Sequence, residues 1–160
     1  MRVEHPFPPL YGPDSERLIL GSFPSVKSRE TTFFYGHPQN RFWKIIAALC
    51  HSDVPKTIEE KTDLIIGNGF ALWDVIASCE IVGSSDSSIT NVRANDLNPI
   101  LSGSRVKKIY CNGTASYRLY RKYIQPLTNI EAAYLPSSSP ANAAWSLDRL
   151  IDTWGNILNS

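Results

Sequence analysis

Residues 33–43 read FFYGHPQNRFW and combine aromatic side chains, a turn and the start of a helix. Beyond Pro38 the apolar positions 42, 45, 46 and 49 recur at helical spacing. This predicts a helix that begins near Gln39 or Asn40, with Asn40 as its cap. The free N–H groups of a helix start, next to aromatic rings, suit a flat polar ligand or a phosphate. A purely structural role, in which Asn40 only caps and His37 only fills a turn, fits the same residues.

Apolar runs on both sides of this stretch alternate with helical patterns. We expect strands at 17–21, 70–73, 106–111 and 130–135, and helices at 57–66, 96–101, 113–123 and in a last amphipathic segment around 145–154. This alternation is typical of the α/β class. It predicts a three-layer αβα sandwich around a central, mostly parallel four-stranded sheet. Because such sheets bind ligands beyond the carboxyl ends of their strands, we expect the site in the segments after Leu20, Trp73, Cys111 and Leu135.

Two segments lack these patterns. Residues 1–14 are rich in proline and are expected to form an irregular strap at the start of a single domain, 1–160. Residues 81–95 contain the polar run Ser84–Ser88, which predicts a surface loop near the site. Within that run Asp86 either faces solvent or turns toward the ligand.

Composition limits the classes of function. A chain of 160 residues with 42% hydrophobic residues suits one domain with its own core. No apolar run reaches membrane-spanning length and the first ten residues do not resemble a signal peptide, so we expect a cytoplasmic protein without membrane contact. The isolated Cys50, Cys79 and Cys111 lack the spacing of metal ligands, and we expect no metal and no cofactor.

The charge pattern restricts any contact with nucleic acid to local patches, since the formal net charge is only +1. Three basic clusters qualify, although each also fits a solvated face. They are Lys27 with Arg29, Arg105 with Lys107 and Lys108, and Arg118 with Arg121 and Lys122.

Three motifs together resemble the uracil-DNA glycosylase superfamily: GSFPS at 21–25, GHPQNRFWKII at 36–46 and LPSSSPAN at 135–142. The similarity extends over about 18–154 and is greatest to the hypoxanthine-DNA (deoxyinosine) glycosylase family, with the mismatch-specific uracil/thymine-DNA glycosylases next. It implies a monofunctional enzyme of base excision repair that hydrolyses the N-glycosidic bond of a deaminated base, hypoxanthine or possibly uracil, and leaves an abasic site. We expect a monomer that acts on DNA containing such a base.

Departures from the superfamily pattern shape the expected chemistry. Many members place a water-activating Asn or Asp where this chain has Phe23, and the HPQN-type segment instead implies that Asn40 is the catalytic residue. Uracil enzymes often carry His or Asn where Ser137 stands. These differences, together with Gly36 beside Tyr35, favour a pocket enlarged for a purine.

The resemblance also implies roles for the other site residues. Tyr35 corresponds to an aromatic that stacks on the flipped base, and Asp74 to a base-reading side chain, although Asp74 could also only cap a turn. His37 fits a contact with base or phosphate as well as a structural turn, and backbone N–H groups near Phe23 and Ser25 are expected to stabilise the leaving base. The expected DNA-binding residues are Ser22, Ser25, Ser137, Ser138, Ser139, Pro140, Ala141 and Asn142.

Two alternatives remain open at the level of sequence. The chain could be a catalytically silent nucleic-acid or nucleotide-binding module, because a fold does not by itself give activity. It could also be a mismatch-specific uracil-DNA glycosylase.

Overall fold

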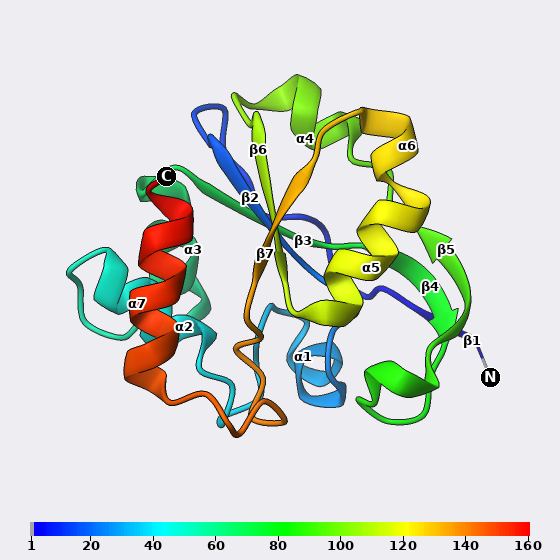
Figure 1. Ribbon diagram of the computed structural model, residues 1–160, viewed down its shortest axis with the longest axis horizontal. Coiled ribbons are helices and arrows are strands. Elements are labelled where there is room, and N and C mark those ends of the chain that lie inside the picture. Colours follow the sequence, from blue (N-terminus) through cyan, green and yellow to red (C-terminus); the bar gives the residue numbers. More distant parts are fainter. Residues whose placement is uncertain (1) are drawn as a thin grey trace.

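Four parallel strands form the central sheet of the computed structural model, which describes residues 2–160 (Figure 1). They are β2 (Arg17–Gly21), β3 (Phe70–Asp74), β6 (Lys108–Asn112) and β7 (Ala132–Leu135), in the order β3-β2-β6-β7. Leu18, for example, lies opposite Ala71 on one side and Ile109 on the other. Both neighbours are buried, as expected for apolar runs covered on two faces. The four expected strands are confirmed, although β6 and β7 each begin two residues later than the apolar pattern predicts.

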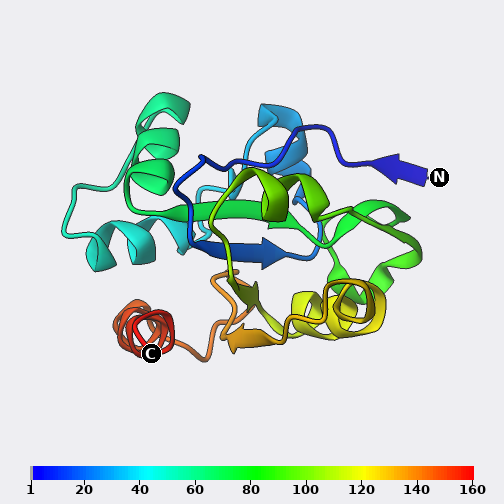
Figure 2. The ribbon, with the colours of Figure 1, turned by 90° about the horizontal axis from the view of Figure 1, so that it is seen from above.

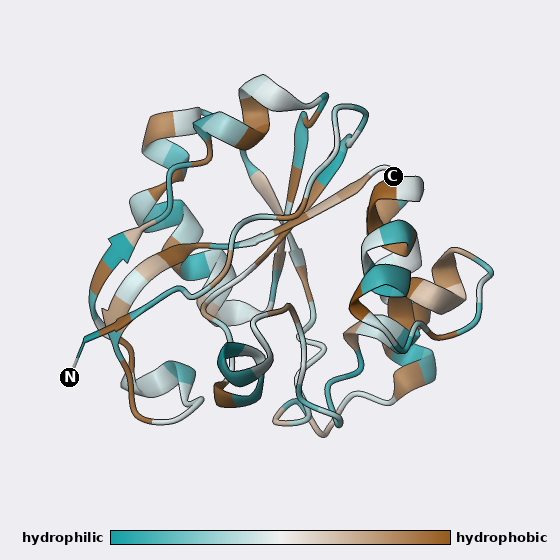
Figure 3. Cartoon of the chain, turned by 180° about the vertical axis from the view of Figure 1, so that it is seen from behind, coloured by the Kyte–Doolittle hydropathy of each residue, from teal (hydrophilic) through white to brown (hydrophobic). Residues whose placement is uncertain are grey.

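Helices cover both faces of this sheet, which confirms the three-layer αβα arrangement. Figure 1 shows one group of helices on one side of the sheet and a second group on the other. The first group is α2 (Phe42–Leu49), α3 (Ile58–Gly67) and α7 (Leu147–Leu158), and the second is α5 (Thr114–Tyr123) and α6 (Gln125–Thr128). Alternating apolar and polar bands mark α7 as amphipathic (Figure 3), and its Trp154 is fully buried against the ring of Phe42.

Local signals fix several helix starts. A capping box begins α3, because Thr57 Oγ1 accepts from the Glu60 N–H and Glu60 Oε1 accepts from the Thr57 N–H. The start of α2 is later than expected, at Phe42 instead of Asn40, and Arg41 occupies the cap position without a side-chain cap bond. Asn40 Oδ1 nevertheless accepts from the Phe42 N–H at 2.9 Å. Asn40 therefore satisfies a helix N–H group from just outside the helix.

A second, antiparallel sheet corrects two expectations. It consists of β1 (Arg2–Glu4), β4 (Ile76–Glu80) and β5 (Thr90–Ala94) in the order β1-β4-β5. Residues 1–14 are thus not wholly irregular, and 81–95 are not only a loop, since a 3-10 turn (Asp86–Ser88) leads into β5. The short strand β1 and the polar, partly exposed β5 carry too few apolar residues to reveal their periodicity.

The rest of the N-terminal segment runs beside β3. Leu10 and Leu72 exchange two backbone hydrogen bonds of 3.0 and 2.8 Å, and Phe7 is buried in the core. These contacts cover an otherwise open edge of the central sheet. Figure 2 shows this segment running along the β3 side of the sheet before β2 begins.

Two short helices complete the fold. Ser25 caps α1 (Val26–Thr31), whose mostly polar sequence gave no helical signal, and α4 (Asn98–Gly103) begins two residues after Asp96. Among residues 2–160, no helix combines the length and the apolar character needed to cross a membrane.

Candidate active site

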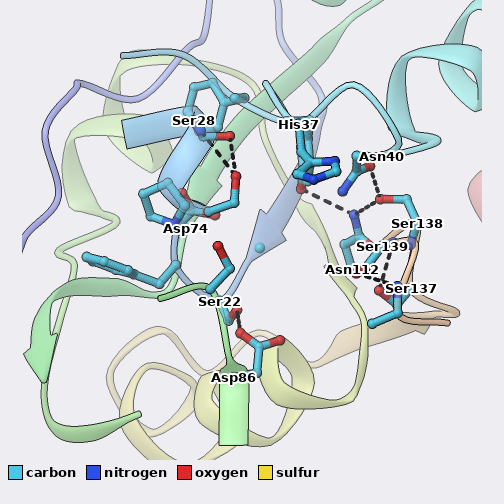
Figure 4. Close-up of a pocket in the computed structure, with 18 of the residues that line it drawn as sticks. Ser22, Ser28, His37, Asn40, Asp74, Asp86, Asn112, Ser137, Ser138 and Ser139 are labelled. Carbon is cyan, nitrogen blue, oxygen red and sulfur yellow. Dashed lines mark hydrogen bonds between the residues drawn. The ribbon is translucent and has the colours of Figure 1, made fainter. Parts of the chain in front are cut away.

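A cavity of about 340 Å³ opens at the carboxyl ends of the parallel strands (Figure 4). Each of the four segments expected there contributes to its wall: 21–25 after β2, Asp74 at the end of β3, Asn112 at the end of β6, and 137–141 after β7. The segment 33–43 closes another side with several of its residues. The topology of a parallel sheet explains why pieces so distant in sequence meet here.

The structure brings almost all of the site residues expected from sequence to this cavity. Its lining includes Ser22, Phe23, Ser25, Tyr35, His37, Asn40, Asp74, Ser137, Ser138, Ser139, Pro140 and Ala141. Asn142 instead lines an adjoining groove with Arg118 and Trp145. That groove shares Ser137, Ser139 and Ala141 with the cavity.

A chain of hydrogen bonds fixes the amide of Asn40. Asn112 Nδ2 donates to Ser138 Oγ at 2.9 Å, and Ser138 Oγ donates to Asn40 Oδ1 at 2.8 Å. The Phe42 N–H is the second donor to the same amide oxygen. The oxygen side of the Asn40 amide is therefore held toward Ser138 and the helix start, as Figure 4 shows for the labelled pair.

Asn112 is a site residue that sequence reasoning missed. It ends β6, and its Oδ1 accepts from the Ser138 N–H at 3.0 Å while its Nδ2 also points at the Tyr35 hydroxyl, 3.3 Å away. It thus joins three walls of the cavity. The available signal was its place directly after an expected strand, at the edge where such sheets bind ligands.

Arg41 holds the loop that follows β7. Its guanidinium donates to the carbonyl oxygens of Ser138, Ser139, Asn142 and Trp145, and its backbone N–H also donates to Ser138. The planar fork of a guanidinium can reach several acceptors at once, which a lysine ammonium cannot. One side chain therefore sets the shape of the segment expected to contact DNA.

Tyr35 forms an aromatic part of the wall. Its ring stacks on Phe42 with centroids 3.9 Å apart and planes 15° apart, so one of its two faces is already covered. Burial, and secondarily the negative charge of Asp74, raise the pKa of the Tyr35 hydroxyl far above its ordinary range. The hydroxyl is therefore neutral near pH 7.

Gly36 does not enlarge the cavity, contrary to expectation. Its N–H donates to Ser28 Oγ, and a Cβ at this position would come within 2.8 Å of Thr31 Oγ1. Gly36 is absent from the cavity lining. The missing side chain makes room for the close approach of α1, not for a base.

The polar run 84–88 is largely exposed, as expected of a surface loop, but two of its side chains form hydrogen bonds with the first loop and the start of α1. Ser84 Oγ accepts from the Val26 N–H, and Asp86 Oδ1 accepts from Ser22 Oγ at 2.8 Å. Desolvation raises the pKa of Asp86, although the side chain keeps access to solvent at the cavity mouth; the hydrogen bond from Ser22 opposes this shift. Asp86 thus lines the cavity and is exposed to solvent as well.

Within the described part of the chain, no group of three or more His, Cys, Asp and Glu side chains is placed to hold a metal ion.

Comparison with known proteins agrees with this geometry. The family model of the uracil DNA glycosylase superfamily matches residues 8–154. A protein named hypoxanthine DNA glycosylase from Methanosarcina acetivorans is 30% identical over 148 residues, which are 92% of this chain and 93% of the relative. One of the same name from Methanosarcina barkeri is 29% identical over 138 residues, 85% and 86% of the two chains.

A solved structure is similar over nearly its whole length. It is the solution structure of a candidate uracil DNA glycosylase from Methanosarcina acetivorans, 30% identical, with a TM-score of 0.82 over 98% of this chain and 96% of that one. The match to the family model covers the central sheet, the segment 33–43 and the loop after β7. The chain therefore belongs to the uracil DNA glycosylase superfamily.

Proposed function

We propose that this DNA glycosylase hydrolyses the N-glycosidic bond of deoxyinosine in DNA, releasing hypoxanthine, with uracil as a slower second substrate. The observation that carries the proposal is the fixed Asn40 amide at the wall of a cavity at the carboxyl edge of the sheet. The names of two relatives with about 30% identity support hypoxanthine as the base. Asn40 is the proposed catalytic residue.

Asn40 would place the attacking water. The reaction passes through a sugar cation, so water must be held near the anomeric carbon while the base departs. Both lone pairs of Asn40 Oδ1 are already used, by the Phe42 N–H and by Ser138 Oγ. The hydroxyl of Ser138 can rotate away, whereas a backbone N–H cannot. A water that takes the place of the Ser138 hydroxyl would therefore be held by an acceptor already aligned.

The first loop would stabilise the departing base. The backbone N–H groups of Phe23 and Ser25 have no acceptor among residues 2–160, and both residues line the cavity. Donors fixed where negative charge develops act without reorganisation, and removal of one such donor costs about 100- to 1,000-fold in rate in other enzymes. An amide is a poor base, so we expect these N–H groups to supply most of the acceleration.

The cavity suits a single flipped base. Phe23, Tyr35 and His37 line the cavity and would provide ring surfaces for a flat base. Extrusion of the nucleotide into such a pocket costs a few kcal/mol of stacking; glycosylases are themselves a general example of the class that does this.

The loop after β7 and the adjoining groove would hold the DNA backbone. Ser137, Ser138 and Ser139 carry short hydroxyl donors, which position a strand without reading its sequence. The groove beside them also contains Arg118 and the start of α5. Two of the three basic clusters therefore reach the neighbourhood of the cavity: Arg118 lines the groove, and Arg29 lies 5.5 Å from the ring of Phe23.

Base removal can be tested on matched duplexes that contain inosine, uracil, xanthine or only undamaged bases. Protein treatment followed by alkali breaks the strand only where a base has been removed. We expect breakage at inosine first and at uracil second. If no substrate is broken, the protein is a catalytically silent binding module. If the strand breaks faster at uracil than at inosine, the protein is a uracil-DNA glycosylase instead.

A further inference from the structure

The N-terminal segment reaches the wall of the cavity through one buried polar contact. His5 Nε2 lies 2.7 Å from Oδ2 of Asp74, and the two side chains are only 3% and 6% exposed. Asp74 lines the cavity, whereas His5 stands behind it. A buried carboxylate is costly without a hydrogen-bond donor. His5 supplies that donor from outside the central sheet.

Aromatic rings fix the direction of the imidazole. The ring of His5 packs against Phe7 and Trp73, each with centroids 4.5 Å away, and lies nearly perpendicular to the ring of Phe23, with centroids 6.0 Å apart. The Phe7 N–H makes a long, 3.5 Å contact to Nδ1. If Nδ1 accepts this hydrogen bond, the proton of the neutral ring is on Nε2, and the Nε2–H points at Asp74.

The second carboxylate oxygen of Asp74 is left for a ligand. Oδ1 accepts no hydrogen bond from residues 2–160, yet every fully enclosed side-chain polar atom among them has a partner. Oδ1 is therefore reached from the cavity. It lies close to Gly21, where an added Cβ would come within 2.4 Å of it and 3.3 Å of the Tyr35 hydroxyl.

We propose that His5 is a positioning residue for base selection: its Nε2–H aligns the Asp74 carboxylate so that Oδ1 accepts the ring N–H of a deaminated base. This rests on the function proposed above. Deamination of adenine or cytosine turns an amino group into a carbonyl and places a hydrogen on the adjacent ring nitrogen. A carboxylate oxygen attracts that N–H and repels the lone pair that the parent base presents there. Asp74 therefore separates hypoxanthine from adenine and uracil from cytosine.

The test measures base preference in binding, apart from excision. In protein carrying Asn40→Ala, the ratio of Kd values for adenine and inosine duplexes is compared with and without His5→Leu. We expect this ratio to fall by about 10- to 100-fold, the effect of losing one well-aligned hydrogen bond to a charged group. His5→Gln should retain much of the ratio because its amide can still donate to Oδ2.

A matched control and a double variant separate positioning from packing. Phe7→Leu disturbs the same aromatic cluster without removing the donor, so it should lower the Tm but keep the preference. Asp74→Ala should lose the preference, and adding His5→Leu should cause no further loss. If His5→Leu does not fold, His5→Asn replaces it, since its shorter amide cannot reach the carboxylate.

The outcomes distinguish this inference from the proposed function. An unchanged ratio in His5→Leu, or losses that add in the double variant, would overturn the role of His5 even if the parent protein removes hypoxanthine. If the ratio falls as expected but the parent protein removes no base from any duplex, the inference is supported and the proposed function is refuted. Affinity for a duplex with a tetrahydrofuran site, which has no base, should not change in any His5 variant.

Discussion

Ser138 is central to the site at the level of single residues. It is buried, donates to Asn40 Oδ1 and accepts from Asn112 Nδ2. We expect Ser138→Ala to slow base excision, because the Phe42 N–H alone would hold the Asn40 amide until the water binds. Stability should fall by about 1–3 kcal/mol, because an Asn112 N–H loses its acceptor. Single-turnover excision and thermal unfolding measure the two effects. Ser102→Ala, an exposed hydroxyl on α4, is the control, and parental excision by Ser138→Ala would argue against the network.

Gly21 gives a second prediction at this scale. A Cβ there would lie 2.4 Å from Asp74 Oδ1, so Gly21→Ala must displace the carboxylate or the strand end. We expect a lower Tm and a weaker preference for inosine over adenine. Gly67→Ala is the matched control, because nothing lies within 4 Å of its added Cβ and alanine is the better helix former by about 0.5–1 kcal/mol. Unaltered stability and preference in Gly21→Ala would contradict the geometry.

Individual residues also show where sequence reasoning reaches its limit. The motifs indicated Asn40 and the serines after β7 through their resemblance to the superfamily, and Asn40 also through its place at a helix start. The motifs could not show whether Gly36 makes room for a neighbouring helix or for a base. The prediction that Gly36 enlarges the cavity was therefore wrong. His5 was missed because its partner is Asp74, 69 positions away in the sequence.

The loop after β7 is held in shape by Arg41. Its carbonyl oxygens converge on the Arg41 guanidinium. We expect Arg41→Lys to loosen the loop, because a lysine ammonium cannot match the planar fork, and to weaken both binding to tetrahydrofuran-site DNA and excision. Arg105→Lys, an exposed position before β6, controls for the loss of a guanidinium elsewhere. Equal DNA affinity for Arg41→Lys and the parent would show that the loop does not depend on Arg41.

Some strands and helices could be predicted from the sequence more readily than others. Three buried strands of the central sheet are short apolar runs that end in Gly, Asp or Asn, and their continuous apolar character predicted them. The antiparallel sheet and α1 escaped, since β1 has three residues, β5 is polar, and α1 depends on the Ser25 cap and packing against Gly36. Tertiary contacts, not local preference, stabilise these pieces.

Charge is the property of the whole molecule that matters for DNA. With a net charge of +1, binding must depend on a few local phosphate contacts, and Arg118 lies in the groove beside the cavity. We expect Arg118→Glu to weaken binding to all sequences and to reduce the slope of log K against log salt by roughly one phosphate contact. Lys107→Glu makes the same charge change just before β6, at the amino ends of the parallel strands and away from the cavity. Identical slopes for the two variants would exclude Arg118 from the interface.

The central claim is that Asn40 positions water for hydrolysis of the glycosidic bond. The most direct measurement is single-turnover release of hypoxanthine from an inosine duplex by Asn40→Ala and by the parent, with enzyme in excess. We expect the rate to fall by roughly 100-fold or more while affinity for a tetrahydrofuran-site duplex stays within about twofold. Stability should fall by only about 1 kcal/mol, the usual cost of losing a cap-like hydrogen bond. Release at the parental rate would contradict the account and move the catalytic role to Asp74 or His37.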